Sequence, residues 1–133
     1  MPTFDVDRQD ITAFEVDGAY LFKQYFDQGH VFNALELYHY SNRYRFEIPG
    51  NYLDKIKQIL DGNFYDLRIE DGLSSYCVVK QKDSNYRDIL KNSVLRKRHS
   101  EHIIFLMKDR LSVKQTIENG ATPLTETDIY AEL

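Results

Sequence analysis

The chain has 133 residues, of which 42% are hydrophobic and 14% aromatic, and its formal net charge at pH 7 is −4. This apolar content excludes a disordered tail, and the length suits one domain that buries its own hydrophobic core. We therefore expect a single domain over residues 1–133. The aromatic residues are ten Tyr and eight Phe with no Trp, so many of them should be half-buried or lie at an interface.

The chain contains one cysteine, which excludes an internal disulfide framework and favours a reducing compartment. Its first ten residues are polar and acidic and do not resemble a secretory signal. No stretch approaches 18 consecutive apolar residues, so we expect no membrane-spanning segment. These features predict a cytoplasmic protein without membrane association.

Residues 1–42 are expected to form an N-terminal helical arm that packs on the core. Apolar residues recur at helical spacing from Ala13 to Phe26, with Gly18 as a weak point or boundary. Residues 31–40 fit two structures, a helix with one apolar stripe or a strand joined to the next segment by Ser41-Asn42. We favour the helix because the hairpin would change the strand order of the predicted sheet.

Residues 43–108 show the clearest alternation of strand and helix patterns. The expected order is strand 43–49, helix 52–62, strand 64–70, strand 73–81, helix 84–99 and strand 102–108. Asp71-Gly72 predicts a two-residue hairpin between the second and third strands. This βαββαβ order is that of ferredoxin-like folds, so we expect an α+β domain with a ferredoxin-like core over residues 43–108.

Two shorter segments follow this core. Residues 109–120 are expected to form a short C-terminal helix that begins with a capping box from Ser112 to Gln115 and ends at Asn119-Gly120. Residues 121–133 are acidic and weakly patterned, which predicts a loosely attached or disordered tail.

The second face of the predicted sheet carries apolar residues that need a cover. In the hairpin register, Cys77 and Val79 point away from the core, and the strand at 103–107 adds apolar groups to the same face. The cover is either the helices before Tyr44 or a second copy of the chain. The leading expectation is therefore a small non-catalytic interaction or regulatory domain that acts through protein contacts or as a homodimer. Its expected interface residues are Tyr38, Tyr40, Arg45 and Val79.

The alternative function is binding of RNA or single-stranded DNA. The expected contact residues are basic side chains of two strands and a helix end: Arg43, Arg45, Lys80, Arg96, Lys97 and Arg98. An RNA-recognition motif uses the same βαββαβ order, with aromatic rings on its open strand faces. In this chain Arg43, Arg45 and Glu47 occupy the corresponding outward positions, so that resemblance does not extend to the contact residues.

Signatures of catalysis are weak. The sequence has no phosphate-binding loop, no dinucleotide-binding glycine motif and no nucleophile elbow. Pro49-Gly50-Asn51 only faintly resembles the glycine-rich loop of small-ligand regulatory domains. His99 and His102 are expected to straddle a helix end and a strand start, which would not aim both rings at one metal. Cys77 is expected to be an inert buried thiol in a strand. We therefore expect no enzyme activity, metal or cofactor.

Overall fold

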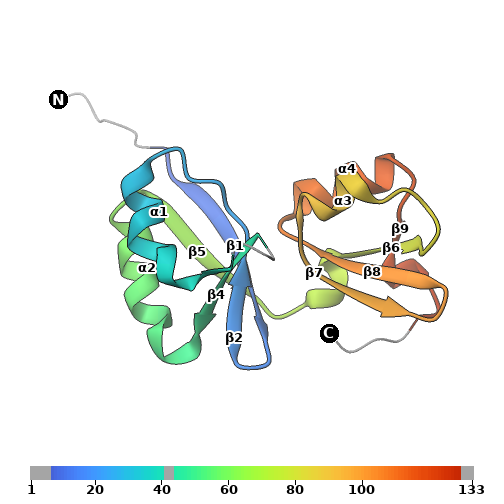
Figure 1. Ribbon diagram of the computed structural model, residues 1–133, viewed down its shortest axis with the longest axis horizontal. Helices are drawn as coiled ribbons and strands as arrows, with labels where there is room; N and C mark the ends of the chain where they lie inside the picture. Colours follow the sequence, from blue (N-terminus) through green and yellow to red (C-terminus); the bar gives the residue numbers. More distant parts are fainter. Residues whose placement is uncertain (1–6, 41–43, 130–133) are drawn as a thin grey trace. The chain divides into compact units, whose positions relative to one another are not determined.

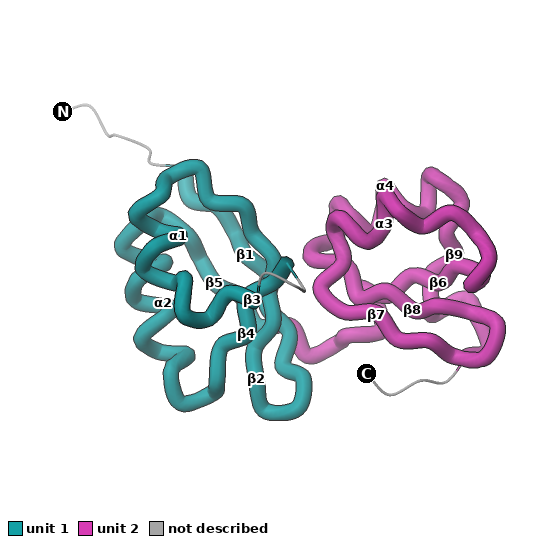
Figure 2. The backbone as a smooth tube through the Cα atoms, in the orientation of Figure 1, with its two compact units in different colours: residues 1–69 teal, residues 70–133 magenta. Residues whose placement is uncertain are grey.

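The computed structural model describes residues 7–40 and 44–129. The chain divides into two compact units, Met1–Ile69 and Glu70–Leu133 (Figure 2). Within the described residues, one sheet has five strands and the other has four. The mixed α+β class is confirmed. The ferredoxin-like core is not confirmed, because the strands of residues 43–108 are divided between the two sheets.

The first unit consists of a sheet with two helices on one face (Figure 1). Its strands are β1 (Gln9–Val16), β2 (Ala19–Phe22), β3 (His39–Tyr40), β4 (Arg45–Pro49) and β5 (Tyr65–Glu70), in the order β3-β4-β2-β1-β5. Its helices are α1 (Gly29–Leu35) and α2 (Leu53–Asp61), each next to a short 3-10 turn, η1 (Glu36–Tyr38) and η2 (Gly50–Tyr52). Phe22 and Phe46 stack at 4.9 Å between ring centroids in the core beneath the helices.

The predicted helix between Ala13 and Phe26 is wrong, because this segment forms the β1–β2 hairpin. Val16 pairs with Ala19 across the turn. The two turn residues, Asp17 and Gly18, have φ angles of 52° and 82°. Two residues in the left-handed region match the right-handed twist of the flanking strands, which is why an Asp-Gly pair favours a hairpin over a helix here.

Residues 31–40 combine both of the structures that their pattern allows. The segment begins within α1, continues through η1 and ends as β3. In the ladder between β3 and β4, His39 pairs with Phe46 and Tyr40 pairs with Arg45. The loop proposed at Ser41-Asn42 lies outside the described residues.

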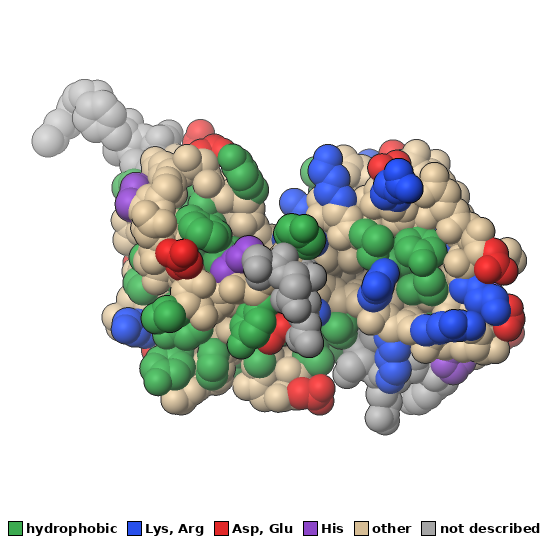
Figure 3. Space-filling model, viewed as in Figure 1, with side chains coloured by type: hydrophobic (Ala, Val, Ile, Leu, Met, Phe, Trp, Pro, Cys, Tyr) green, Lys and Arg blue, Asp and Glu red, His purple; other side chains and the backbone are tan. Residues whose placement is uncertain are grey.

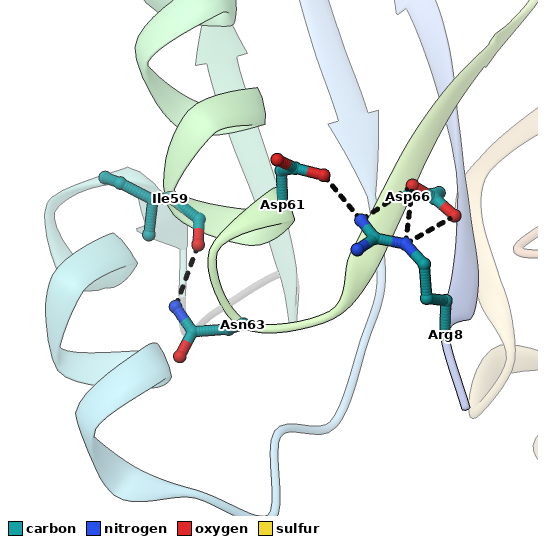
Figure 4. Close-up of polar contacts among 5 residues, drawn as sticks. All are labelled: Arg8, Ile59, Asp61, Asn63 and Asp66. Carbon is teal, nitrogen blue, oxygen red and sulfur yellow. Dashed lines mark hydrogen bonds and ion pairs between the residues drawn. The ribbon is translucent and has the colours of Figure 1, made fainter. Parts of the chain in front are cut away.

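Arg8 joins three parts of the first unit (Figure 4). Its Nη2 lies 2.6 Å from Asp61 Oδ1 and 2.8 Å from Asp66 Oδ1, and its Nε also donates to Asp66. The hydrogen bond from Arg8 lowers the pKa of the Asp66 carboxyl below its usual range. Nearby, Asn63 Nδ2 donates to the Ile59 carbonyl at 2.8 Å. These contacts fix the start of β1 against the end of α2 and the start of β5.

The second unit is built on the four-stranded sheet, in the order β7-β8-β6-β9. Its strands are β6 (Cys77–Gln81), β7 (Ser93–His99), β8 (His102–Met107) and β9 (Thr122–Pro123). Its helices are α3 (Arg87–Leu90) and α4 (Arg110–Glu118), with 3-10 turns η3 (Leu73–Tyr76) and η4 (Leu124–Glu126). Strand β8 is apolar on both faces and pairs on both edges, which confirms the central strand expected at residues 102–108.

Two local predictions in this unit are wrong. Asp71-Gly72 does not close a hairpin, because β5 and β6 belong to different sheets and residues 73–76 form η3. The helix predicted over residues 84–99 is only the four-residue α3, and β7 follows it. The apolar spacing of Ile89, Leu90 and Val94 fits a long helix, but Val94 lies in β7, which pairs with β8 on both sides of a register shift at this residue.

Segments of the second unit lie on both faces of its four-stranded sheet. Val78, Phe105 and Ile89 belong to one buried cluster on the face that bears α3 and α4. On the other face, Val79 pairs with Ile104, and turns η3 and η4 contact β8 and β6. Val79 is only 4% exposed. The sequence predicted that the helices before Tyr44 or a second copy of the chain would cover the apolar outer face of the sheet. In the structure, turns η3 and η4 of this unit contribute to that cover.

The C-terminal region is more ordered than its composition predicts. The predicted helix is present as α4, but Asp109 caps it, since Asp109 Oδ1 accepts from the Ser112 backbone N–H at 2.7 Å. Its end at Asn119 and Gly120 is confirmed, and Gly120 has a φ of 102°. Residues 122–126 are attached through β9 and the buried Leu124, so the loose tail is wrong for this part. Residues 130–133 lie outside the described residues.

The described helices are short. The longest, α2 and α4, have nine residues each. In residues 7–40 and 44–129, no helix combines the length and the apolar character that crossing a membrane requires.

Candidate nucleic-acid interface

Strand β7 divides the basic run at residues 96–98 between two faces of the sheet. Arg96 pairs with Phe105 and Arg98 pairs with Ile103, and both of these partners belong to the buried cluster under α3. Lys97 pairs with Ile104 and therefore lies on the opposite face. The sequence prediction of one basic helix end is thus wrong, and of these three residues Arg96 and Arg98 lie on the helix-bearing face.

Arg96 and Arg98 line a hollow of about 490 Å³, which we call the basic hollow. Its lining residues are Lys82, Asp83, Tyr86, Arg96, Arg98 and Ile103. Three cations and one carboxylate therefore surround one concave surface. Figure 3 shows Lys and Arg side chains around a hydrophobic patch over the β7–β8 hairpin.

The three cations of the basic hollow differ in their hydrogen-bond and ion-pair partners. Lys82 Nζ lies 3.1 Å from Glu101 Oε2, in an exposed ion pair. Arg98 Nε donates to the Ser100 carbonyl at 3.3 Å. Within the described residues, the side chain of Arg96 forms no hydrogen bond or ion pair. Exposed ion pairs contribute little stability, so all three cations can contact an anionic ligand at small cost.

Tyr86 forms the wall of the basic hollow on the side of α3. Its ring is half-buried and lies 5.5 Å from the ring of Phe105, at an interplanar angle of 47°. This contact places the ring against the core, and Tyr86 also lines the hollow. The site therefore combines positive charge with a fixed aromatic ring, which is the combination that single-stranded nucleic-acid sites use.

A second hollow of about 470 Å³ lies on the other side of Tyr86, between α3 and α4; we call it the polar hollow. Its side-chain amides come from Asn85, Asn92, Gln115 and Asn119. Its charged residues are Lys80, Lys91, Asp88 and Glu118, two of each sign. Tyr86 is shared by both hollows.

The structure brings together three of the six predicted nucleic-acid contacts. Lys80 pairs with Ile103 in the ladder between β6 and β8, so it lies on the same sheet face as Arg98 and Arg96. Arg45 belongs to the first unit, where it is 9% exposed and its Nη2 lies 2.7 Å from Glu47 Oε1. Its burial and this ion pair do not suit a phosphate contact. Arg43 lies outside the described residues.

Lys82 and Tyr86 are not among the contact residues predicted from the sequence. Lys82 continues the β6 ladder, since its backbone N–H donates to the Glu101 carbonyl at 2.9 Å. Two pairs of cations at strand spacing, Lys80 with Lys82 and Arg96 with Arg98, are visible in the sequence. They identify one face only once residues 93–99 are assigned to a strand.

The predicted interface residues divide between the units. Tyr38 and Tyr40 lie in the first unit, and the ring of Tyr38 contacts that of Tyr52 at 5.9 Å between centroids. Tyr40, Tyr44 and Tyr52 are exposed. Arg45 and Val79 are buried and present little surface to a partner. We call Tyr38, Tyr40, Tyr44 and Tyr52 the tyrosine surface.

The position of β7 offers a second explanation for its charges. This strand is at the edge of the sheet, where lysine and arginine discourage pairing with another chain. That explanation covers residues 96–98. It does not account for Lys82, which follows the inner strand β6, or for the aromatic wall at Tyr86.

Two of the histidines and the cysteine were considered as possible metal ligands or nucleophiles, and the structure places each of them. His99 and His102 lie opposite each other at the end of the β7–β8 hairpin, so the expected helix boundary between them is absent. Among the described residues, no group of three or more His, Cys, Asp or Glu side chains is placed to hold a metal ion. Burial raises the pKa of the Cys77 thiol to about 12, and its Sγ donates to the Leu73 carbonyl. This thiol is therefore a poor nucleophile at neutral pH.

Comparison with known proteins identifies no family for this chain. The chain matches no protein-family model, no curated protein and no solved structure.

Proposed function

We propose that the protein is a non-catalytic binding protein whose second unit binds single-stranded nucleic acid in the basic hollow. The observation that supports this function is the convergence of Lys82, Arg96 and Arg98 beside the half-buried ring of Tyr86. Neither the charges nor the ring would suffice alone, because a charged edge strand and a core aromatic residue are both ordinary features.

The geometry of β7 suits a chain of phosphates. Residues two apart on a strand are separated by roughly 6.6 to 6.8 Å and point to the same side. Arg96 and Arg98 can therefore contact successive phosphates of an extended strand. A guanidinium group matches two oxygens of one phosphate, and each phosphate contact releases counterions.

Tyr86 favours a single strand over a duplex. Tyr86 is half-buried and lines a concave surface, where an unpaired base can turn toward its ring. Bases inside a duplex are already stacked and paired, so they cannot reach such a ring without being extruded.

The test is a fluorescence-anisotropy titration of labelled single-stranded RNA at several salt concentrations. The double variant Arg96→Ala/Arg98→Ala should bind more weakly than wild type. The slope of log affinity against log salt should fall by about 1.4, since each lost phosphate contact removes about 0.7.

The matched control is Lys55→Ala/Lys57→Ala, which removes two exposed cations from α2. It should retain the binding and the salt slope of wild type. No binding by wild type at low salt would refute the proposal. Equal losses in the two double variants would attribute any binding to net charge and would also refute it.

A second candidate function is self-association through the tyrosine surface. Tyr44 is 72% exposed, and the adjoining η1 residue Leu37 is 91% exposed. Tyr38 contacts Tyr52 in the same unit, and exposed aromatic groups are typical of interfaces, where tyrosine is enriched. A symmetric pair of chains would bury such a surface against its own copy.

Light scattering after size-exclusion chromatography tests this candidate. Wild type should have the mass of a dimer, and Tyr44→Ser/Tyr52→Ser should have the mass of a monomer with an unchanged circular dichroism spectrum. A monomeric wild type at high concentration would exclude self-association. Tyr25→Ser is the control, because Tyr25 is an exposed tyrosine outside the tyrosine surface.

A further inference from the structure

The polar hollow between α3 and α4 suggests a second role that rests on the proposed function. We infer that it is a nucleobase pocket, which receives a base of the strand whose phosphates occupy the basic hollow. Phosphate contacts position a strand but carry no base information, so a base preference requires a separate set of groups.

The polar hollow contains the groups that recognise base edges. Asn92, Gln115 and Asn119 each carry a carbonyl acceptor and an amino donor. No hydrogen bond of these three side chains occurs within the part of the chain that the structure describes. Side-chain amides of this kind pair with the donors and acceptors along the edge of an unpaired base.

The charges of the polar hollow fit a neutral ligand. Lys80 and Lys91 are offset by Asp88 and Glu118. The basic hollow has three cations and one carboxylate, which suits phosphate. The excess positive charge of the basic hollow therefore suits the phosphate of a nucleotide, and the balanced charge of the polar hollow suits its neutral base.

The polar hollow is large enough and firmly built. Its volume of about 470 Å³ lies within the usual range of small-ligand sites. The Asn92 backbone is held on both sides, because its N–H donates to the Ile89 carbonyl and its carbonyl accepts from Lys108 at 2.9 Å. Gln115 projects from α4, whose residues Ser112 and Thr116 are buried. A pocket on fixed elements orients its ligand without a large ordering cost.

Tyr86 connects the two hollows. It lines both of them, so a nucleotide with its phosphate at Arg96 or Arg98 can direct its base past the ring. The ring then stacks on one base while the amides contact the edge of that base or of its neighbour. This arrangement predicts that the protein distinguishes a strand with bases from one without them.

The experiment compares oligouridylate, oligoadenylate and an abasic ribose-phosphate oligomer of the same length at one salt concentration. Wild type should bind at least one of the base-bearing strands roughly tenfold more tightly than the abasic one, which is the scale of one stacked base. Gln115→Leu and Asn92→Leu, made separately, should reduce this ratio while affinity for the abasic oligomer stays unchanged. Gln58→Leu, an exposed amide on α2, should leave the ratio unchanged.

The outcomes separate this inference from the proposed function. Equal binding of base-bearing and abasic strands by wild type would overturn the nucleobase pocket and leave phosphate binding intact. The nucleobase pocket would also be overturned if both amide variants fold, bind, and keep the wild-type ratio of affinities for base-bearing and abasic strands. Arg96→Ala/Arg98→Ala should weaken all three oligomers alike, and failure of wild type to bind any of them would overturn both proposals.

Discussion

Arg96 and Lys97 are adjacent in the chain, yet their side chains leave β7 on opposite faces of the four-stranded sheet. Arg96 pairs with Phe105 on the face under α3, and Lys97 pairs with Ile104 on the other face. Two cations of equal charge, one residue apart, therefore border different environments. Substituting each of the two residues therefore tests whether RNA affinity depends on the position of a cation or only on the net charge of the protein.

Lys97→Ala should retain most of the affinity for single-stranded RNA, whereas Arg96→Ala should weaken it several-fold and lower the salt slope by about 0.7. The physical reason is that, of these two side chains, Arg96 lines the basic hollow and Lys97 does not. Anisotropy titrations over a salt series measure both quantities. Equal losses in the two variants would show that the protein attracts RNA through its overall field and not through this hollow.

Val79→Asp should unfold or strongly destabilise the second unit, by more than about 3 kcal/mol, because it places a carboxylate in a buried position. Val79→Ala, which removes volume without adding charge, should cost about 2 kcal/mol. Urea unfolding followed by circular dichroism gives both values. A folded Val79→Asp protein of reduced mass would instead restore the expectation that Val79 lies at a subunit interface.

Gly18→Ala should destabilise the β1–β2 hairpin by about 1 kcal/mol, because Gly18 has a φ of 82° that alanine adopts at a cost. An added Cβ would meet nothing within 4 Å, so the cost comes from the backbone alone. Gly29→Ala in α1 is the control, since a Cβ there also meets nothing within 4 Å. It should be neutral or stabilising. Equal effects in thermal unfolding would contradict the positive-φ explanation.

Asp66→Asn should remove part of the acid sensitivity of the first unit. The hydrogen bond from Arg8 lowers the pKa of Asp66 in the folded protein, so the unfolded state binds this proton more readily. The stabilisation is therefore present above the ordinary carboxyl pKa and is lost as pH falls through the lowered value. The difference in Tm between wild type and the variant should be largest near neutral pH and should shrink toward pH 2. A difference that stays constant with pH would assign the effect of the variant to something other than this titration.

Several elements follow from local sequence pattern alone. The apolar stripe of α2, the double-sided strand β8 and the glycine at the end of α4 all appear where the sequence predicts them. These features depend on residues within a few positions of one another. Helical stripes and full burial of a short strand leave clear local patterns, which is why they are readable without a structure.

Other elements depend on which distant segment is the partner. Asp17-Gly18 and Asp71-Gly72 carry the same turn signal, but only the first pair closes a hairpin, because only its flanking strands pair with each other. Ile89 and Val94 fit a helix by spacing until β8 takes residues 93–99 as a neighbour. A sheet partner is chosen by non-local burial and hydrogen bonding, which a local period does not record.

For the candidate site, too, the sequence predicts some features and only the tertiary structure decides the others. The basic residues Lys80, Arg96 and Arg98 are identifiable from the sequence as possible phosphate contacts. Their gathering beside Tyr86, and the separation of Lys97 from them, depend on the register between β6, β8 and β7. A one-residue change of register moves every side chain to the other face. The residue types therefore follow from the sequence, whereas the hollow that they form exists only because three strands meet in one register.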